Sequence, residues 1–225
     1  MEKKFHIDKA EELNDDIVYI DGDVDEHSII QAVKLKVDGQ TKESSMQFTR
    51  YAKIQKHSGT LRCSEAKIQT LENGNINATK IEIENSNGGN LYAQDINIVN
   101  VKKDTNIFAS NMINIKNLES DNTIITVDYK EIPILVSKLE LINEDIKTLK
   151  IELENAKKHN IPKIELLEKD ISKLKKEKKF ILHSTSTAKL HVDNSTKDTN
   201  KIIFIKNDVE TIINIKKGNN INISI

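Results

Sequence analysis

The side chains that most often carry covalent or metal chemistry are scarce in this sequence. They comprise one cysteine, Cys63, and the histidines His6, His27, His57, His159, His183 and His191. Zinc sites and cysteine–histidine pairs need such residues at characteristic spacings, and no such spacing occurs here. We therefore predict no catalytic residue, no metal and no cofactor. Cys63 is interpreted as a buried structural thiol, because a reactive thiolate needs an exposed, electropositive setting.

Three acidic residues, Glu82, Glu84 and Asp95, are the remaining candidates for catalysis. Parallel β-helix lyases and hydrolases place carboxylates on outward strand faces, and a pair of carboxylates can cleave a glycosidic bond. Such enzymes are usually secreted and offer aromatic side chains that stack on sugars. Here aromatic residues are 4% of the chain and the first residues contain no apolar leader. We expect the three carboxylates to be solvated, and a carbohydrate-active enzyme is the third of three functional hypotheses.

Five lysines crowd the last part of a predicted helix: Lys173, Lys175, Lys176, Lys178 and Lys179. Cations near a helix C-terminus complement the helix dipole, so a solvated face is the simpler interpretation. If the chain docks a partner protein, we expect the docking surface to include these lysines. His159 and Asn160, at the predicted tip of a helical hairpin, would complete it.

Most of the chain follows a repeat of 15 to 17 residues, in which an aliphatic residue precedes a small residue by two positions. The predicted aliphatic series is Ile30, Met46, Leu61, Ile76, Leu91, Ile107 and Ile124. The predicted small series includes Ala32, Cys63, Ala78, Ala93 and Ala109. Between these triplets runs a second ladder with two apolar residues on one face, the period of a strand. Its pairs are Leu35/Val37, Ala52/Ile54, Ala66/Ile68, Ile81/Ile83, Ile96/Ile98 and Ile113/Ile115.

One repeat has too few apolar residues to bury a face alone, whereas stacked coils turn each position into a continuous internal column. We therefore predict a mainly β fold, a right-handed parallel β-helix. Its corners are rich in Asn and Gly, as at residues 84–90. A β-sandwich is the alternative, but it would not keep the aliphatic and small positions in step. The hexapeptide β-helix of acyltransferases needs an aliphatic residue every six positions, and that period is missing.

The apolar spacing changes at Pro133 to alternating steps of three and four, which predicts an antiparallel coiled-coil hairpin. Residues 157–162 are predicted to form the turn of the hairpin, and the second helix is predicted to begin at Pro162. The predicted seam of the first helix is Leu135, Leu139, Ile142, Ile146, Leu149, Leu153 and Ala156. That of the second is Ile164, Leu167, Ile171, Leu174 and Ile181, with Lys178 at its one weak position. The predicted organisation is a lead-in (1–16), the β-helix (17–130), the hairpin (131–183) and returning strands that complete or cap the helix (184–225).

The charge balance of 34 basic and 35 acidic residues gives no electrostatic footprint for nucleic acid, so no nucleic-acid partner is expected. No window approaches the length of about 18 apolar residues that a membrane span needs, and we expect no integral membrane segment. The single cysteine and the absence of a leader predict a cytoplasmic protein.

A glycine-punctuated parallel β-helix that is interrupted near its end by a helical hairpin resembles the bacterial flagellar assembly protein A family, whose β-helix is bactofilin-like. The segment Val18-Tyr19-Ile20-Asp21-Gly22-Asp23-Val24 looks like that family's entry into the first coil. The resemblance covers residues 17–223 and implies a cytoplasmic structural factor of flagellar assembly or placement. Family members are often longer and richer in glycine. The resemblance supplies no active-site residue.

Two functional hypotheses, both non-catalytic, rank above the carbohydrate-active enzyme. The first is a scaffold or self-assembling structural protein, because open coil ends offer unpaired strand edges. The second is a monomeric adaptor whose projecting hairpin docks one partner protein.

Overall fold

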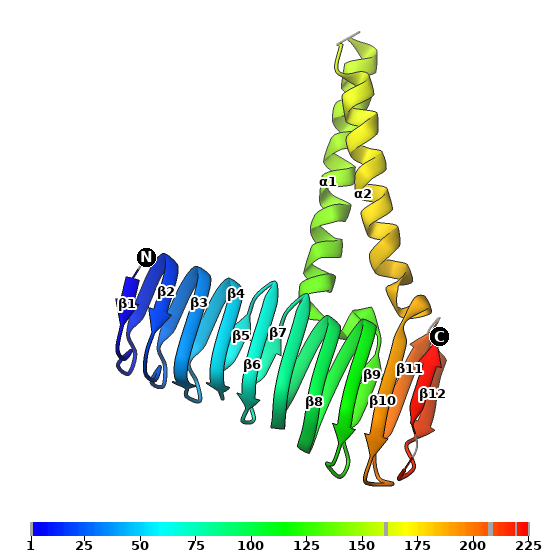
Figure 1. The fold of residues 1–225 in the computed structure, drawn as a ribbon. Coiled ribbons are helices and arrows are strands. Elements are labelled where there is room, and N and C mark those ends of the chain that lie inside the picture. Colours follow the sequence, from blue (N-terminus) through cyan, green and yellow to red (C-terminus); the bar gives the residue numbers. More distant parts are fainter. Residues whose placement is uncertain (1, 160–161, 207–208, 219, 225) are drawn as a thin grey trace.

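The computed structural model describes residues 2–159, 162–206, 209–218 and 220–224, and its strands form one stacked solenoid (Figure 1). Consecutive coils pair in parallel from the N-terminal end to the helical insertion, which confirms the predicted parallel β-helix. The strands before the insertion are β1 (Glu2–Lys4), β2 (Glu12–Ile20), β3 (Ile29–Thr41), β4 (Met46–His57), β5 (Thr60–Arg62), β6 (Glu65–Leu71), β7 (Asn75–Asn77), β8 (Lys80–Leu118) and β9 (Ile124–Val127).

The second apolar ladder is confirmed in full. Leu35 pairs with Ala52 and Val37 with Ile54, and the same register continues through β6 into β8. All the predicted ladder residues are buried, with exposed fractions of at most 4%. Each side chain therefore packs between its counterparts on the coils before and after it, as the alternation of polar and apolar residues requires.

The aliphatic series is confirmed at five positions and wrong at two. Gln47, not Met46, lies in register between Ile30 and Leu61. In the same way Ile125, not Ile124, pairs with Ile107. Successive strand residues point to opposite faces, so an error of one residue exchanges inside for outside. Gln47 is fully buried, and Met46 is 38% exposed.

The small series is buried where predicted at Cys63, Ala78, Ala93 and Ala109. Ala32 differs, because it is only half-buried. It lies in register with Asp15 and Thr49, so the first coils place polar neighbours at this corner.

A third internal column was not predicted. Thr41 pairs with His57, His57 with Leu71 and Leu71 with Ser86, and all four side chains are buried. The column begins with Ile7 and Val24. It mixes apolar and polar residues, which hides it from a search for aliphatic periodicity.

The outer faces carry ladders of asparagine. The amide of Asn90 donates to Asn75 at 2.7 Å, and that of Asn106 donates to Asn90 at 2.8 Å. A parallel series links Asn117, Asn100 and Asn85. Stacked identical amides satisfy one another's hydrogen bonds along the coil axis, which explains the asparagine-rich composition of these repeats.

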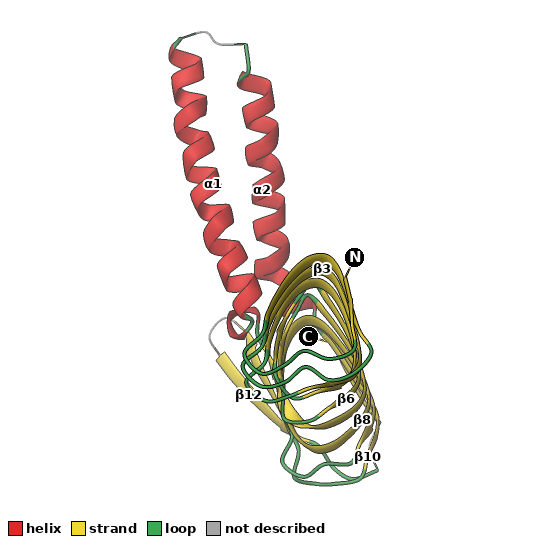
Figure 2. Ribbon diagram, turned by 90° about the vertical axis from the view of Figure 1, so that its left-hand side faces the viewer, coloured by secondary structure: helices red, strands yellow, loops and turns green. Residues whose placement is uncertain are grey.

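Two helices project from the solenoid as a hairpin, α1 (Pro133–Lys158) and α2 (Ile164–Ser184) (Figure 2). Ion pairs of Lys138 with Glu177 and of Lys157 with Glu168 show that the helices run antiparallel. The predicted seam is buried or half-buried along both helices. Pro133 starts α1 as expected, but Pro162 lies in the turn before α2 and does not open it. At a rise of 1.5 Å per residue, α1 is about 39 Å long.

The solenoid continues after the hairpin. β10 (Lys189–Ser195) pairs in parallel with β8, and β11 (Lys201–Lys206) pairs in parallel with β9. The last strands, β12 (Val209–Asn214) and β13 (Ile221–Ser224), instead pair antiparallel with β11 and β10. The hairpin is thus an insertion within the stack of coils. Antiparallel strands follow at the C-terminal end of that stack.

Candidate functional site

The five lysines singled out in α2 do not form one surface. Lys178 is half-buried toward the other helix, and its ammonium donates to Asn143 Oδ1 of α1 at 2.6 Å. Lys173 and Lys175 are exposed. Lys176 and Lys179 line a cavity where the base of the hairpin meets the solenoid wall. The structure therefore brings together only two of the five.

This cavity, the hairpin-base cleft, has a volume of about 470 Å³. Its lining residues are Asn111 of β8, Lys176, Lys179, Phe180, His183 and Ser184 of α2, and Ser186 and Thr187 of the following turn. Lys176, Lys179 and His183 recur at helical spacing, so they share one side of α2. The amide of Asn111 donates to Asp95 at 2.7 Å, which fixes the solenoid side of the cleft.

The cleft combines positive charge with exposed apolar surface. Neither Lys176 nor Lys179 has an ion pair with any residue that the structure describes, and none of the described residues that line the cleft carries a carboxylate. Phe180 is 64% exposed beside them. A cleft of this kind suits a ligand that offers both carboxylates and an apolar side chain.

The base of the hairpin is held by a small apolar cluster. Ile132, Leu135 and Ile181 are buried together, with exposed fractions of at most 3%. The short 3-10 turn before α1 is stabilised by Asp128, whose carboxylate accepts from the Lys130 backbone N–H at 3.1 Å. The cluster therefore holds the two helices against each other at the end of α2 that lines the cleft.

The predicted tip of the hairpin is described only in part. The N–H of His159 donates to the carbonyl of Asn155 at 3.1 Å as α1 ends. Asn160 lies outside the described residues. A docking role for His159 and Asn160 therefore stays a prediction.

Cys63 occupies the small-residue column and is 5% exposed. Burial raises the pKa of its thiol to about 12, with a smaller contribution from the negative charge of Glu65. The thiol is therefore protonated at neutral pH and poorly nucleophilic. His57 occupies the third column, so the two residues do not form a pair.

The three acidic candidates have different partners. Glu82 accepts ion pairs from Lys80 at 2.6 Å and Lys67 at 2.9 Å, and these hydrogen bonds lower the pKa of its carboxyl. A glycosidase acid needs a raised pKa. Glu84 is exposed, and Asp95 accepts from Asn111. The arrangement suits ionic links between coils.

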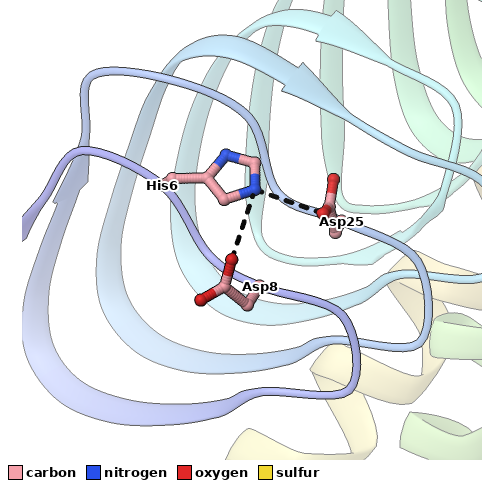
Figure 3. Close-up of side chains that lie close together, drawn as sticks. All are labelled: His6, Asp8 and Asp25. Carbon is pink, nitrogen blue, oxygen red and sulfur yellow. Dashed lines mark hydrogen bonds and ion pairs between the residues drawn. The ribbon is translucent and has the colours of Figure 1, made fainter.

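A cluster near the N-terminal end escaped the sequence analysis (Figure 3). His6 Nε2 lies 3.2 Å from Asp25 Oδ2 and 3.8 Å from Asp8 Oδ1. Ile7 stacks on Val24, which brings the residues that follow, Asp8 and Asp25, into proximity on adjacent coils. The spacing of 17 residues between Asp8 and Asp25 was therefore the sequence signal from which this cluster could have been predicted.

The ligand atoms of this cluster lie within 4.8 Å of one another, a spacing from which imidazole and carboxylate groups can hold a divalent cation. The carboxylate of Asp25, however, also pairs with Lys42 at 2.6 Å. Lys42 and then His6 hold the pKa of that carboxyl below its usual range. We interpret the cluster as an ionic clamp across the first coils.

No protein-family model, curated protein or solved structure matches the chain. Over the residues that the structure describes, neither helix has the length and apolar character of a membrane span.

Proposed function

We propose that this protein is a non-catalytic scaffold in which the solenoid carries the hairpin and the hairpin-base cleft docks one partner protein. The observation that carries the proposal is the grouping of Lys176, Lys179 and Phe180 around a cleft at the anchored end of α2. The lysines are not ion-paired within the described residues, and the aromatic ring is largely exposed.

The energetics of protein recognition support this choice. Aromatic anchors that become buried in a complex contribute much of the binding energy, and cations around them steer the partner and select its charge. Because Ile132, Leu135 and Ile181 hold the two helices together next to the cleft, we expect that little ordering free energy is needed on the helix side of the site on binding. The partner segment we propose is acidic and contains at least one large apolar side chain.

The resemblance to the flagellar assembly protein A family adds a proposed setting, a cytoplasmic factor of flagellar assembly or placement. Genome neighbourhood tests that setting separately. Flagellar genes beside this gene are the expected result, and their consistent absence would contradict it.

The docking proposal is tested by affinity capture from the native host with three forms of the full chain. These are the wild type, Lys176→Glu/Lys179→Glu, and the control Lys173→Glu/Lys175→Glu, which makes the same change of charge on the same helix outside the cleft. We expect a stoichiometric partner that is lost from the first variant and kept by the control. Equal recovery with both variants would contradict the proposal.

A second candidate, self-association, is supported by β12, the strand at the end of the sheet. β12 pairs only with β11 among the described strands, so one edge is open. Val209 is 64% and Ile212 is 55% exposed on it. Open edges with apolar side chains are the usual route by which sheets associate. Sedimentation velocity over a wide concentration range should then show growing species that Ile212→Lys abolishes, whereas an invariant monomer would exclude self-association.

A further inference from the structure

One outer face of the solenoid carries lysines in register on consecutive coils. Lys36 of β3 pairs with Lys53 of β4, and Lys53 pairs with Lys67 of β6. On the N-terminal side the same column continues through Tyr19 and Lys3. We call this column, Lys3, Tyr19, Lys36, Lys53 and Lys67, the lysine ladder.

Like charges at adjacent positions of a sheet oppose folding, because neighbouring strands are only about 4.8 Å apart. The other polar ladders avoid this cost with neutral amides, as between Asn75 and Asn90. Within the lysine ladder, Lys36 is partly neutralised by Asp38 at 2.5 Å and Lys67 by Glu82 at 2.9 Å.

Lys53, between those two neutralised lysines, has no ion pair with any described residue. Lys34, in the adjacent column of outward side chains, also lacks one over the described part of the chain. An anion bound between Lys34 and Lys53 would relieve the repulsion that the fold leaves in place.

The lysine ladder forms one side of a groove of about 580 Å³, and Ile17, Lys34 and Tyr51 line the other. The groove crosses the strands, so it runs along the solenoid axis. A second hollow of about 740 Å³ shares Lys53 and Lys67 with it and extends toward β8. The first groove is lined by five lysines and by the carboxylate of Glu65. Three of the lysines have ion pairs, Lys3 with Asp21 at 3.0 Å, Lys36 with Asp38 and Lys67 with Glu82, so the uncompensated positive charge of the groove lies on Lys34 and Lys53.

We propose that this groove binds a linear acidic polysaccharide. Lys34 and Lys53 lie on adjacent coils and have no ion pair with any described residue, which suits a chain whose anionic groups recur along its length. A groove that crosses strands can accept a ligand longer than itself. The inference is independent of the docking function proposed for the hairpin.

The tyrosine in the ladder argues against single-stranded nucleic acid as the ligand. The ammonium groups of Lys36 and Lys3 lie 4.4 Å and 5.2 Å from the centre of the Tyr19 ring, and bases need uncovered aromatic faces on which to stack. An added peptide strand is also disfavoured, because the groove lies on a face and not on an edge of the sheet.

The test is titration calorimetry of the full chain with polygalacturonate at low salt, with neutral dextran and oligothymidine as comparison ligands. The test variant is Lys34→Gln/Lys53→Gln. The control is Lys102→Gln/Lys103→Gln, which removes two exposed lysines elsewhere on the solenoid. Thermal unfolding of both variants checks that each is folded.

We expect binding of polygalacturonate but not dextran, weakened about tenfold by the test variant and unchanged by the control, since two exposed ion pairs are worth about 1.4 kcal/mol together. Added salt should weaken it further. Three results would overturn the proposal: no binding of polygalacturonate, an equal loss in both variants, or tighter binding of oligothymidine that depends on Lys34 and Lys53. The variant Lys176→Glu/Lys179→Glu should bind the polysaccharide normally, which separates this inference from the docking proposal.

Discussion

The hydroxyl of Thr41 lies 2.5 Å from Nδ1 of His57, on adjacent coils inside the solenoid. The His57 side chain is fully buried, and its Nε2 has no hydrogen-bond partner among the described residues. Burial is the main reason that the pKa of this imidazole falls from 6.5 to about 4, although nearby backbone groups of Asn75 and Gly59 act in the opposite direction. The titratable side chain of His57 thus occupies a position of the third internal column at which the next coil has Leu71.

This buried imidazole should make stability depend on pH. In the unfolded chain His57 takes up a proton near pH 6.5, whereas in the folded chain it does so only near 4. The full stability is therefore present above pH 6.5, and about 3 kcal/mol is lost as the pH falls to 4. Urea unfolding of the wild type and of His57→Leu at pH about 7 and about 4.5 measures this, and the difference between the two proteins should shrink or reverse at pH 7. The carboxylates are the same in both proteins, so their contribution to the pH dependence cancels in the comparison. If the unfolding free energies of the two proteins depended on pH in the same way, His57 would not be the group responsible.

Replacing Gln47 should stabilise the protein. Its Nε2 donates to Ser45 Oγ at 3.0 Å, but its buried Oε1 has no partner among the described residues. Leucine would continue the column between Ile30 and Leu61, and Ser45 would still donate to the Lys42 carbonyl at 2.6 Å. We expect Gln47→Leu to raise the free energy of unfolding by about 1–2 kcal/mol in urea titrations. The outward Gln31→Leu is the control, and a destabilised Gln47→Leu would show that the amide makes contacts beyond those described.

Gly74 should be required because of its close approach to the third column. A Cβ there would lie 2.9 Å from His57 Cδ2 and 3.0 Å from Leu71 Cδ1. We expect Gly74→Ala to cost about 1–3 kcal/mol in urea unfolding, as overpacking does. In a His57→Ala background the same substitution should cost less, because the ring that it meets is gone. An unchanged cost in that background would mean that Leu71 or the backbone, and not the ring, opposes the added methyl group.

Shortening the hairpin should leave the solenoid folded. Replacing residues 137–178 with a short flexible linker keeps Ile132, Leu135 and Ile181 at the base, and β10 pairs directly with β8. We expect a single cooperative thermal transition and an unchanged β signal in circular dichroism. Loss of cooperativity would show that the long helices, and not the coil stack, position the last strands.

The second ladder was predictable because each strand alternates apolar and polar residues, and that period has one structural meaning. Met46 and Ile124 were misplaced because a neighbouring residue was equally compatible with the pattern, while the true inward residues are Gln47 and Ile125. Gln47 breaks the apolar rule at a buried position. No periodicity search could therefore have assigned it to the core.

Contacts between coils were harder to predict than the coils themselves. The proximity of His6 and Asp25 depends on the length of one particular coil. The lysines of α2 differ for a separate reason: Lys178 faces α1, whereas Lys176 and Lys179 occupy the side of the helix that lines the cleft. The lysine ladder was hidden for another reason. The net charge of the whole chain is −1, which gives no sign of a local group of cations. The lysines come together in one column only through the register of β3, β4 and β6.

The most direct test of the docking function is site-specific photocrosslinking from the cleft. A photoreactive phenylalanine analogue is placed at Phe180 or, as a control of similar exposure on the same helix, at Leu166, which is 60% exposed. We predict a discrete adduct with one protein from position 180 in native host cells, absent from position 166 and abolished by Lys176→Glu/Lys179→Glu. The same adducts from both positions, or an adduct at position 180 that survives the charge reversal, would contradict docking in the cleft.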